Sequence, residues 1–227
     1  MKRLSIFILT ALLLISCTER ELQLPESNIS EITEVFDVSP IYIFYDENTG
    51  QADFNRNNMI GTTNWLVNID KRLKMGEVLH HLIYLQEKRR GDGFHKNELA
   101  RNYFSCSNTE IMDLSFLDFT EITYHDEAIA DFLKKSSEAS SGLNQVFITF
   151  EAVDKIVIGR QSEMIETNIG KLGQILMGLS AKNDTINLVF LNFSSELTFQ
   201  DYISIKSALY GKEGSKLIMA RDEFIYK

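Results

Sequence analysis

The chain has few of the residues that build cross-links, rigid spacers or basic surfaces. Of its 227 residues only 2 are cysteines and 2 are prolines, and 23 lysines and arginines face 32 aspartates and glutamates, which gives a formal charge of −9. A dense disulfide framework and a long proline-rich spacer are therefore excluded. Because an acidic surface repels phosphate backbones, we expect no nucleic-acid partner.

Long hydrophobic runs are also missing. The apolar run from Leu4 to Ile15 is too short to cross a bilayer, which needs roughly twenty apolar residues. Lys2 and Arg3 precede this run and the small residue Ser16 follows it, an arrangement typical of an export signal. We expect residues 1–16 to be a signal peptide; without these 16 of 227 residues, 211 remain, and loss of Lys2 and Arg3 makes the charge −11.

Cys17 makes this signal more specific. Leu14-Ile15-Ser16-Cys17 resembles the lipobox of bacterial lipoproteins, in which the cysteine is lipidated and becomes the first residue of the mature chain. The resemblance implies palmitate-type acylation of Cys17 and a lipid anchor in the bacterial cell envelope, at the outer membrane or the periplasmic face of the inner membrane. The alternative is an ordinary signal peptide, or a short anchor, with a chance cysteine.

The rest of the chain predicts an α+β protein made of two related small units, each a sheet with helices. We expect this organisation: a polar tether at 17–35, a first α+β unit at 36–127, a linker at 128–143, and a second α+β unit, ββαβαβ-like, at 144–227.

In the first unit, β-branched and aromatic residues predict strands at 41–45 and 52–55 around a turn at 46–50. The other expected elements are a strand through Trp65, Val67 and Ile69, a helix at 75–88, an irregular segment at 94–110, one strand at 111–124, and a helix within 127–143.

In the second unit we expect strands at 146–150 and 155–159, followed by a helix from Ser162 to Leu179. A strand at 186–193 follows, then a helix with Thr198 as its cap and Asp201 as capping-box partner, and a final strand at 217–226.

The two halves can be aligned with each other. Ile41–Ile60 matches Val146–Ile165 without a gap; Trp65, Val67, Ile69 and Leu73 match Val189, Leu191, Phe193 and Leu197; and Glu121–Tyr124 matches Glu223–Tyr226. This alignment predicts an internal duplication with one additional helix in the second half. Two similar βα patterns without common origin are the alternative.

The element order of residues 144–227 resembles the periplasmic domain of ExbD/TolR-type biopolymer-transport proteins. The resemblance implies a non-catalytic domain that binds cell-wall or partner-protein elements, accessory to biopolymer or TonB-type transport. Family members carry a membrane-spanning helix with an acidic residue, whereas Leu4–Ile15 contains no carboxylate. A proton-coupled role is therefore not carried over.

The sequence predicts no catalytic residues, metal ligands or cofactor. His80 and His81 are adjacent on the predicted helix, so we expect their side chains to diverge and to be partly exposed. We interpret His125-Asp126-Glu127 as a solvated strand exit, and Glu121 and Glu223 as protection of strand edges.

We expect the lipid-anchored protein to bind an envelope protein segment or a cell-wall element by strand addition at an exposed sheet edge. The alternative is an exported hydrolase or thiol enzyme that uses Cys106 and His95. A third reading, an oligomeric component, requires an exposed face that contains Phe116 and Phe119.

Overall fold

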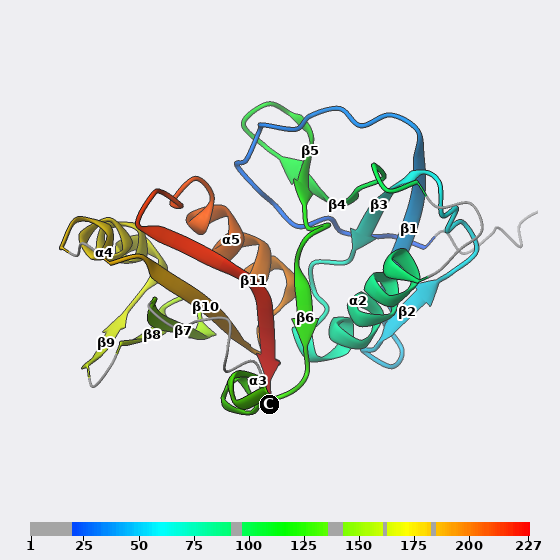
Figure 1. The fold of residues 1–227 in the computed structure, drawn as a ribbon. Coiled ribbons are helices and arrows are strands. Elements are labelled where there is room, and N and C mark those ends of the chain that lie inside the picture. Colours follow the sequence, from blue (N-terminus) through cyan, green and yellow to red (C-terminus); the bar gives the residue numbers. More distant parts are fainter. Residues whose placement is uncertain (1–19, 92–96, 136–142, 161–162, 183–184) are drawn as a thin grey trace, which may run out of the picture.

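A computed structural model describes residues 20–91, 97–135, 143–160, 163–182 and 185–227. Figure 1 shows two sheets side by side with helices packed against them. One sheet has five strands and the other has six, and both mix parallel and antiparallel pairs. The predicted α+β class is confirmed. No helix in these described ranges is long and apolar enough to span a membrane.

The five-stranded sheet has the order β2-β1-β3-β4-β5. Its elements are β1 (Val38–Tyr45), β2 (Ala52–Asn55), β3 (Asn64–Ile69), α2 (Met75–Arg90), β4 (Asn102–Asn108) and β5 (Asp113–Asp118). The outer pairs β1–β2 and β4–β5 are antiparallel, whereas β3 runs parallel to both β1 and β4. Helix α2 supplies the crossover that parallel strands require.

The six-stranded sheet has the order β6-β11-β10-β7-β8-β9. Its elements are β6 (Thr123–His125), α3 (Ile129–Lys135), β7 (Asn144–Ala152), β8 (Lys155–Arg160), β9 (Glu163–Thr167), α4 (Ile169–Lys182), β10 (Asn187–Ser194), α5 (Phe199–Leu209) and β11 (Leu217–Tyr226). Strand β8 is antiparallel to β7 and β9, and the other pairs are parallel.

The predicted local signals act as expected at two places. In the β1–β2 hairpin, the Asp46 side chain accepts the Asn48 N–H at 2.8 Å, and Gly50 has a φ of +70°. At the start of α5, the Thr198 hydroxyl accepts the Asp201 N–H at 3.1 Å, and the Asp201 carboxylate accepts the Thr198 N–H at 3.0 Å. The hairpin and the capping box are therefore confirmed.

Several predicted elements were wrong. The irregular segment contains strand β4, and the single strand predicted at 111–124 is two strands in different sheets. Because β6 pairs with β11, the expected first unit gives its last strand to the second sheet. The helix predicted from Ser162 begins only at Ile169, since Glu163–Thr167 forms β9; Ser162 itself is outside the described residues. Ile165 has helical spacing from Ile169, but the pairing of residues 163–167 with β8 determines that this segment is a strand.

The two units share a topology: a hairpin, a parallel strand, a crossover helix and another parallel strand. Matched backbone hydrogen bonds also join them at the helix starts. The Met75 N–H donates to the Leu197 C=O at 2.8 Å, and the equivalent bond 124 residues later runs the other way, from the Phe199 N–H to the Leu73 C=O at 2.7 Å. The same relation holds for Gly76 N–H to Ser195 C=O (2.9 Å) and Gln200 N–H to Lys71 C=O (3.1 Å). The alignment of Leu73 with Leu197 therefore describes equivalent positions about an approximate twofold axis.

Strand register corrects the rest of the alignment. Parallel pairing places Ile41 opposite Val67 and Ile148 opposite Leu191, so Ile41 matches Ile148 and not Val146. This error of two residues keeps inward positions inward, because side chains alternate with a period of two. The match of Glu121–Tyr124 with Glu223–Tyr226 was wrong, since β6 lies beside β11 and pairs Tyr124 with Glu223.

By the same register, β4 is the strand equivalent to β11. Phe104 lies opposite Val67 and Glu223 lies opposite Leu191. Phe104 therefore occupies in the first unit the position that Glu223 occupies in the second.

Residues 20–35, expected to form part of a free polar tether, are docked along the fold. Backbone bonds join Gln23 to Lys71 at 2.8 Å, Pro25 to Ser107 at 2.8 Å, and Ile32 to Phe116 at 2.9 Å. The Glu26 carbonyl accepts the side-chain amide of Gln200 on α5 at 3.1 Å. This segment, which we call the strap, contacts both units.

Candidate functional site

The thiol chemistry considered for Cys106 meets an unfavourable environment. Cys106 lies on β4, is 1% exposed and belongs to the main hydrophobic cluster. Burial raises the pKa of its thiol to about 12, so at neutral pH the nucleophilic thiolate is scarcely formed. His95, its proposed base, lies outside the described residues, as does Cys17.

The adjacent histidines of α2 differ from the prediction. Their rings do not diverge, since the centroids of His80 and His81 are 3.7 Å apart. His81 is only 6% exposed, packs against Phe54, and neither of its ring nitrogens has a hydrogen-bond partner among the described residues. Burial, with smaller effects from His80 and Arg56, lowers the pKa of His81 to about 4. In the described ranges, no three or more His, Cys, Asp or Glu side chains form a group that could hold a metal.

His125 ends β6 and is half-buried, whereas Asp126, the next residue of the predicted solvated strand exit, is exposed. The His125 Nε2 is 2.7 Å from an Asp222 carboxylate oxygen, and its ring stacks on Phe224 and contacts Phe132. This pairing ties β6 to β11 through side chains as well as backbone.

Glu223 is not an edge-protecting residue. It is 0% exposed on β11, between β6 and β10, where it accepts the Tyr202 hydroxyl at 2.8 Å and pairs with the Lys206 ammonium. Glu121 lies in the turn before β6 and pairs with Arg221 at 2.9 Å. The two acids therefore have different surroundings and different roles.

Two tyrosines extend this buried network. The hydroxyl groups of Tyr124 and Tyr202 are 2.9 Å apart, and Tyr202 reaches Glu223. Burial, followed by the negative charge of Glu223, holds the pKa of both phenols well above the usual value. Strands β6 and β11 and helix α5 are thus joined by neutral phenols around one ion pair, in which Glu223 is buried and Lys206 is partly exposed.

The face required by the oligomeric reading is not available, because Phe116 and Phe119 are both buried. The sheet edges offer a different surface. Strand β5 is partly covered, since the Phe116 N–H donates to Ile32 in the strap. Strands β2 and β6 are short.

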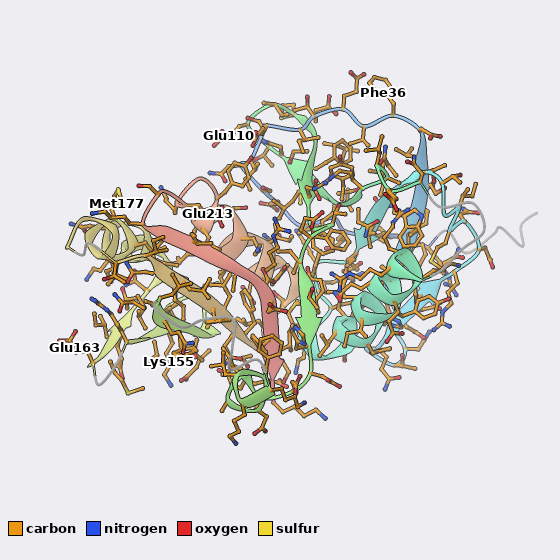
Figure 2. All side chains as sticks on the ribbon, in the orientation of Figure 1. Phe36, Glu110, Lys155, Glu163, Met177 and Glu213 are labelled. Carbon is orange, nitrogen blue, oxygen red and sulfur yellow. The ribbon has the colours of Figure 1, made fainter. Side chains whose placement is uncertain are left out.

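Strand β9 is the most open edge. It is the last strand of its sheet, pairs only with β8, and four of its five residues are exposed. Met164 is 78% exposed and Ile165 is 40% exposed. Figure 2 shows Glu163, at the start of β9, at the periphery of the molecule. An exposed edge with accessible apolar side chains and a strand neighbour on one side only is suited to pairing with another extended chain.

The sequence contained an indication of this edge that helical spacing concealed. Met164, Ile165 and Glu166 follow the strand at 155–159 closely enough to form a second strand antiparallel to it.

Comparisons with protein-family models, curated proteins and solved structures gave no match for this chain. The function is therefore inferred from the geometry of these residues.

Proposed function

We propose that this is a lipid-anchored, non-catalytic binding protein of the bacterial cell envelope that recognises an extended protein segment by strand addition. The observation that carries the proposal is β9, an exposed edge strand with Met164 and Ile165 accessible. In strand addition, main-chain hydrogen bonds supply affinity and alternating side chains supply specificity.

Alternation on β9 gives both of its faces an apolar and an acidic residue. Ile165 shares a face with Glu163, and Met164 shares the other with Glu166. An incoming strand would therefore find apolar contact and a negative charge on either side. The charges also discourage indiscriminate edge pairing, as they do in other exposed sheets.

The proposed anchor would lie close to the fold. Only Thr18 and Glu19 separate Cys17 from Arg20, where the strap is already paired with Asp53 on β2. Three Cα–Cα steps span at most about 11 Å. In Figure 1, β2 and β9 lie at opposite ends of the molecule. A lipid on Cys17 would thus hold β2 near the membrane and leave β9 directed away from it.

The proposal includes an accessory role in biopolymer or TonB-type transport, because residues 144–227 resemble the periplasmic domain of ExbD/TolR-type proteins. The unit contains the hairpin, the two helices and the two parallel strands on which the resemblance depends, with β9 in addition. Within the proposal, the partner is an envelope protein and the anchor replaces the family's membrane helix.

The anchor is tested by Cys17→Ser. We expect the variant to move from the membrane fraction to the soluble periplasmic fraction and to lose incorporation of labelled palmitate, with Cys106→Ser as the control that stays membrane-bound. If Cys17→Ser remains in the membrane fraction, lipidation is not the means of attachment.

The edge is tested by placing a photo-crosslinking amino acid at Met164 and, as a control, at Met177, which is exposed on α4. Proline is then introduced separately at Ile165 and Glu166. Because backbone N–H groups alternate in direction along an edge strand, one of these two faces the open side. We expect the proline on the open side to abolish crosslinking from position 164. Crosslinking from position 177 and the circular dichroism spectrum should stay unchanged. A Met164 crosslink that survives both substitutions would refute strand addition at β9.

A further inference from the structure

A second open edge lies on β11. Strand β6 pairs only with Asp222–Phe224, and Gly214 exchanges two backbone hydrogen bonds with Leu217, at 3.0 and 3.1 Å. Residues 218–221 therefore have no strand on the side away from β10 among the described residues, and their register with β10 shifts after Met219. A groove of about 640 Å³ lies along this open part, between β11 and the connection from β5 to β6. Figure 2 labels Glu213, which lines the groove between α5 and β11.

The groove has the dimensions and the lining of a peptide site. The four residues 218–221 span about 13 Å, which matches a short extended peptide segment. Apolar side chains line both sides: Leu117, Ile122, Leu209, Ile218 and Met219. Apolar contacts beside an open strand are suited to the side chains of an added strand.

The backbone of this edge is partly occupied by a side chain. The Met219 N–H, which does not pair with a neighbouring strand on the open side, donates to Oε1 of Glu213 at 3.2 Å. A carboxylate oxygen therefore takes the position that the carbonyl of an added strand would take. An incoming chain can replace this bond with one of its own and release Glu213.

The charges along the groove are unequal. Lys206 is neutralised by Glu223, and Arg221 by Glu121. Asp118 pairs with Arg101 at 2.6 Å, outside the lining. Glu31 of the strap and Glu213 have no ion-pair partner within the described ranges. The groove therefore favours a cation.

We propose that the groove beside residues 218–221 binds an extended peptide segment of a partner protein that alternates apolar side chains with lysine or arginine. The segment adds as a strand to β11, its carbonyl accepts the Met219 N–H, and its cation pairs with Glu213 and Glu31. This site is separate from β9 and does not depend on the function proposed for that edge. The acidic charge of −9 makes a second copy of the chain the less complementary occupant.

The test uses the full chain in detergent micelles and a fluorescent peptide of about seven residues, with valine alternating with lysine. Its twin carries glutamate in place of lysine. We expect an increase in anisotropy with the lysine peptide and at least about tenfold weaker binding of the glutamate peptide. Equal binding of both peptides, or of neither, would overturn the proposal.

Variants locate the binding. Met219→Pro removes the N–H, and Ile218→Arg places a cation on the rim of the groove; each should abolish binding of the lysine peptide. If circular dichroism shows that Met219→Pro does not fold, the binding measurement on Ile218→Arg decides whether the peptide occupies the groove. Glu213→Gln and Glu31→Gln should each weaken binding by about two- to fivefold, the range for exposed ion pairs.

Two controls distinguish peptide binding in the groove from binding at β9 and from self-association of the chain. Glu163→Gln and Glu166→Gln on β9 should leave the affinity unchanged; if they lower it and the groove variants do not, the peptide binds at β9 and the groove proposal is wrong. Sedimentation of the peptide-free chain should give a monomer. A dimer that Ile218→Arg dissociates would identify a second copy as the occupant and overturn the proposal.

Discussion

The two units have equivalent central strands but carry different kinds of side chain at the equivalent core positions. In the second unit, Tyr202, Lys206 and Glu223 form a polar network in which Tyr202 and Glu223 are buried and Lys206 is partly exposed. The equivalent positions of the first unit hold Val78, Leu82 and Phe104, all 0% exposed and apolar. The same backbone arrangement thus accommodates either a polar network or apolar side chains at these positions. The comparison indicates that the polar network is not needed to form the unit.

The edges differ in a related way. The strap covers part of the first sheet at β5, whereas the second sheet ends in the exposed β9 and carries the half-open β11. The segments that are not repeated account for two of these differences: β9 forms the exposed edge, and the strap covers β5. The second surface proposed for binding lies on β11, which is equivalent to β4 of the first unit.

The largest expected effect comes from replacing polar core side chains of the second unit with the apolar side chains found at the equivalent positions of the first unit. Glu223→Phe leaves the Lys206 ammonium without its buried partner, and we expect it to lower the free energy of unfolding by about 3 kcal/mol. The double variant Glu223→Phe/Lys206→Leu copies Phe104 and Leu82, and should come within about 1 kcal/mol of the wild type.

Urea unfolding of the single and double variants measures this coupling. Tyr202 keeps Tyr124 as a hydroxyl partner in both, so the difference reports on the ion pair. A double variant as unstable as the single one would contradict the equivalence of the two cores.

A smaller effect concerns acid stability. His81 on α2 occupies the position of Ile205 on α5, 124 residues later, and burial lowers the pKa of His81 from 6.5 to about 4. The folded state therefore prefers neutral His81: its contribution is complete above pH 6.5 and is lost as the pH falls towards about 4. Between pH 7 and 5 we expect a loss on the order of 1 to 2 kcal/mol.

His81→Ile should remove this loss, which urea midpoints at pH 7 and pH 5 will measure. His80→Gln, at the exposed neighbour, serves as the matched control and should retain the acid sensitivity. If His80→Gln and not His81→Ile abolishes the pH dependence, the buried ring is not its source.

The smallest effect distinguishes the two helix starts. Thr198 caps α5 through its hydroxyl, whereas Lys74 at the start of α2 can donate but cannot accept an N–H and pairs with exposed Glu196. Thr198→Ala should cost about 1 kcal/mol. Lys74→Ala should leave the free energy of unfolding nearly unchanged, because its ion pair with Glu196 is exposed to solvent. Thermal or urea unfolding compares them directly, and equal costs would show that the two caps do not differ.

Much of the fold was predictable because local signals agree with the tertiary contacts. Alternation fixed β1 and β3, turn chemistry fixed the hairpin at Asp46–Gly50, and Thr198 fixed the start of α5. Strand β4 was missed because Asn102, Ser105 and Asn108 interrupt its apolar pattern; all three are buried. Partners far along the sequence make this possible: Arg89 donates to the Asn102 side chain, and the Asn108 side chain donates to the Ile29 carbonyl.

The candidate sites were predictable only in kind. The sequence favoured an open sheet edge but assigned Met164 and Ile165 to a helix, because apolar spacing at Ile165, Ile169 and Leu172 fits both structures. Only pairing with β8 decides between them. The lipid attachment of Cys17 stays a prediction.

The sequence by itself determined the α+β class, the acidic charge, most strand and helix centres, and the resemblance of the first residues to a lipoprotein signal. These features depend on neighbours within a few positions of the chain. Only the tertiary contacts decide that the strap is docked, that Glu223 is buried and paired with Lys206, and that β9 and part of β11 have one strand neighbour among the described residues. Which backbone groups stay open depends on partners far away in the sequence, and no local pattern encodes them.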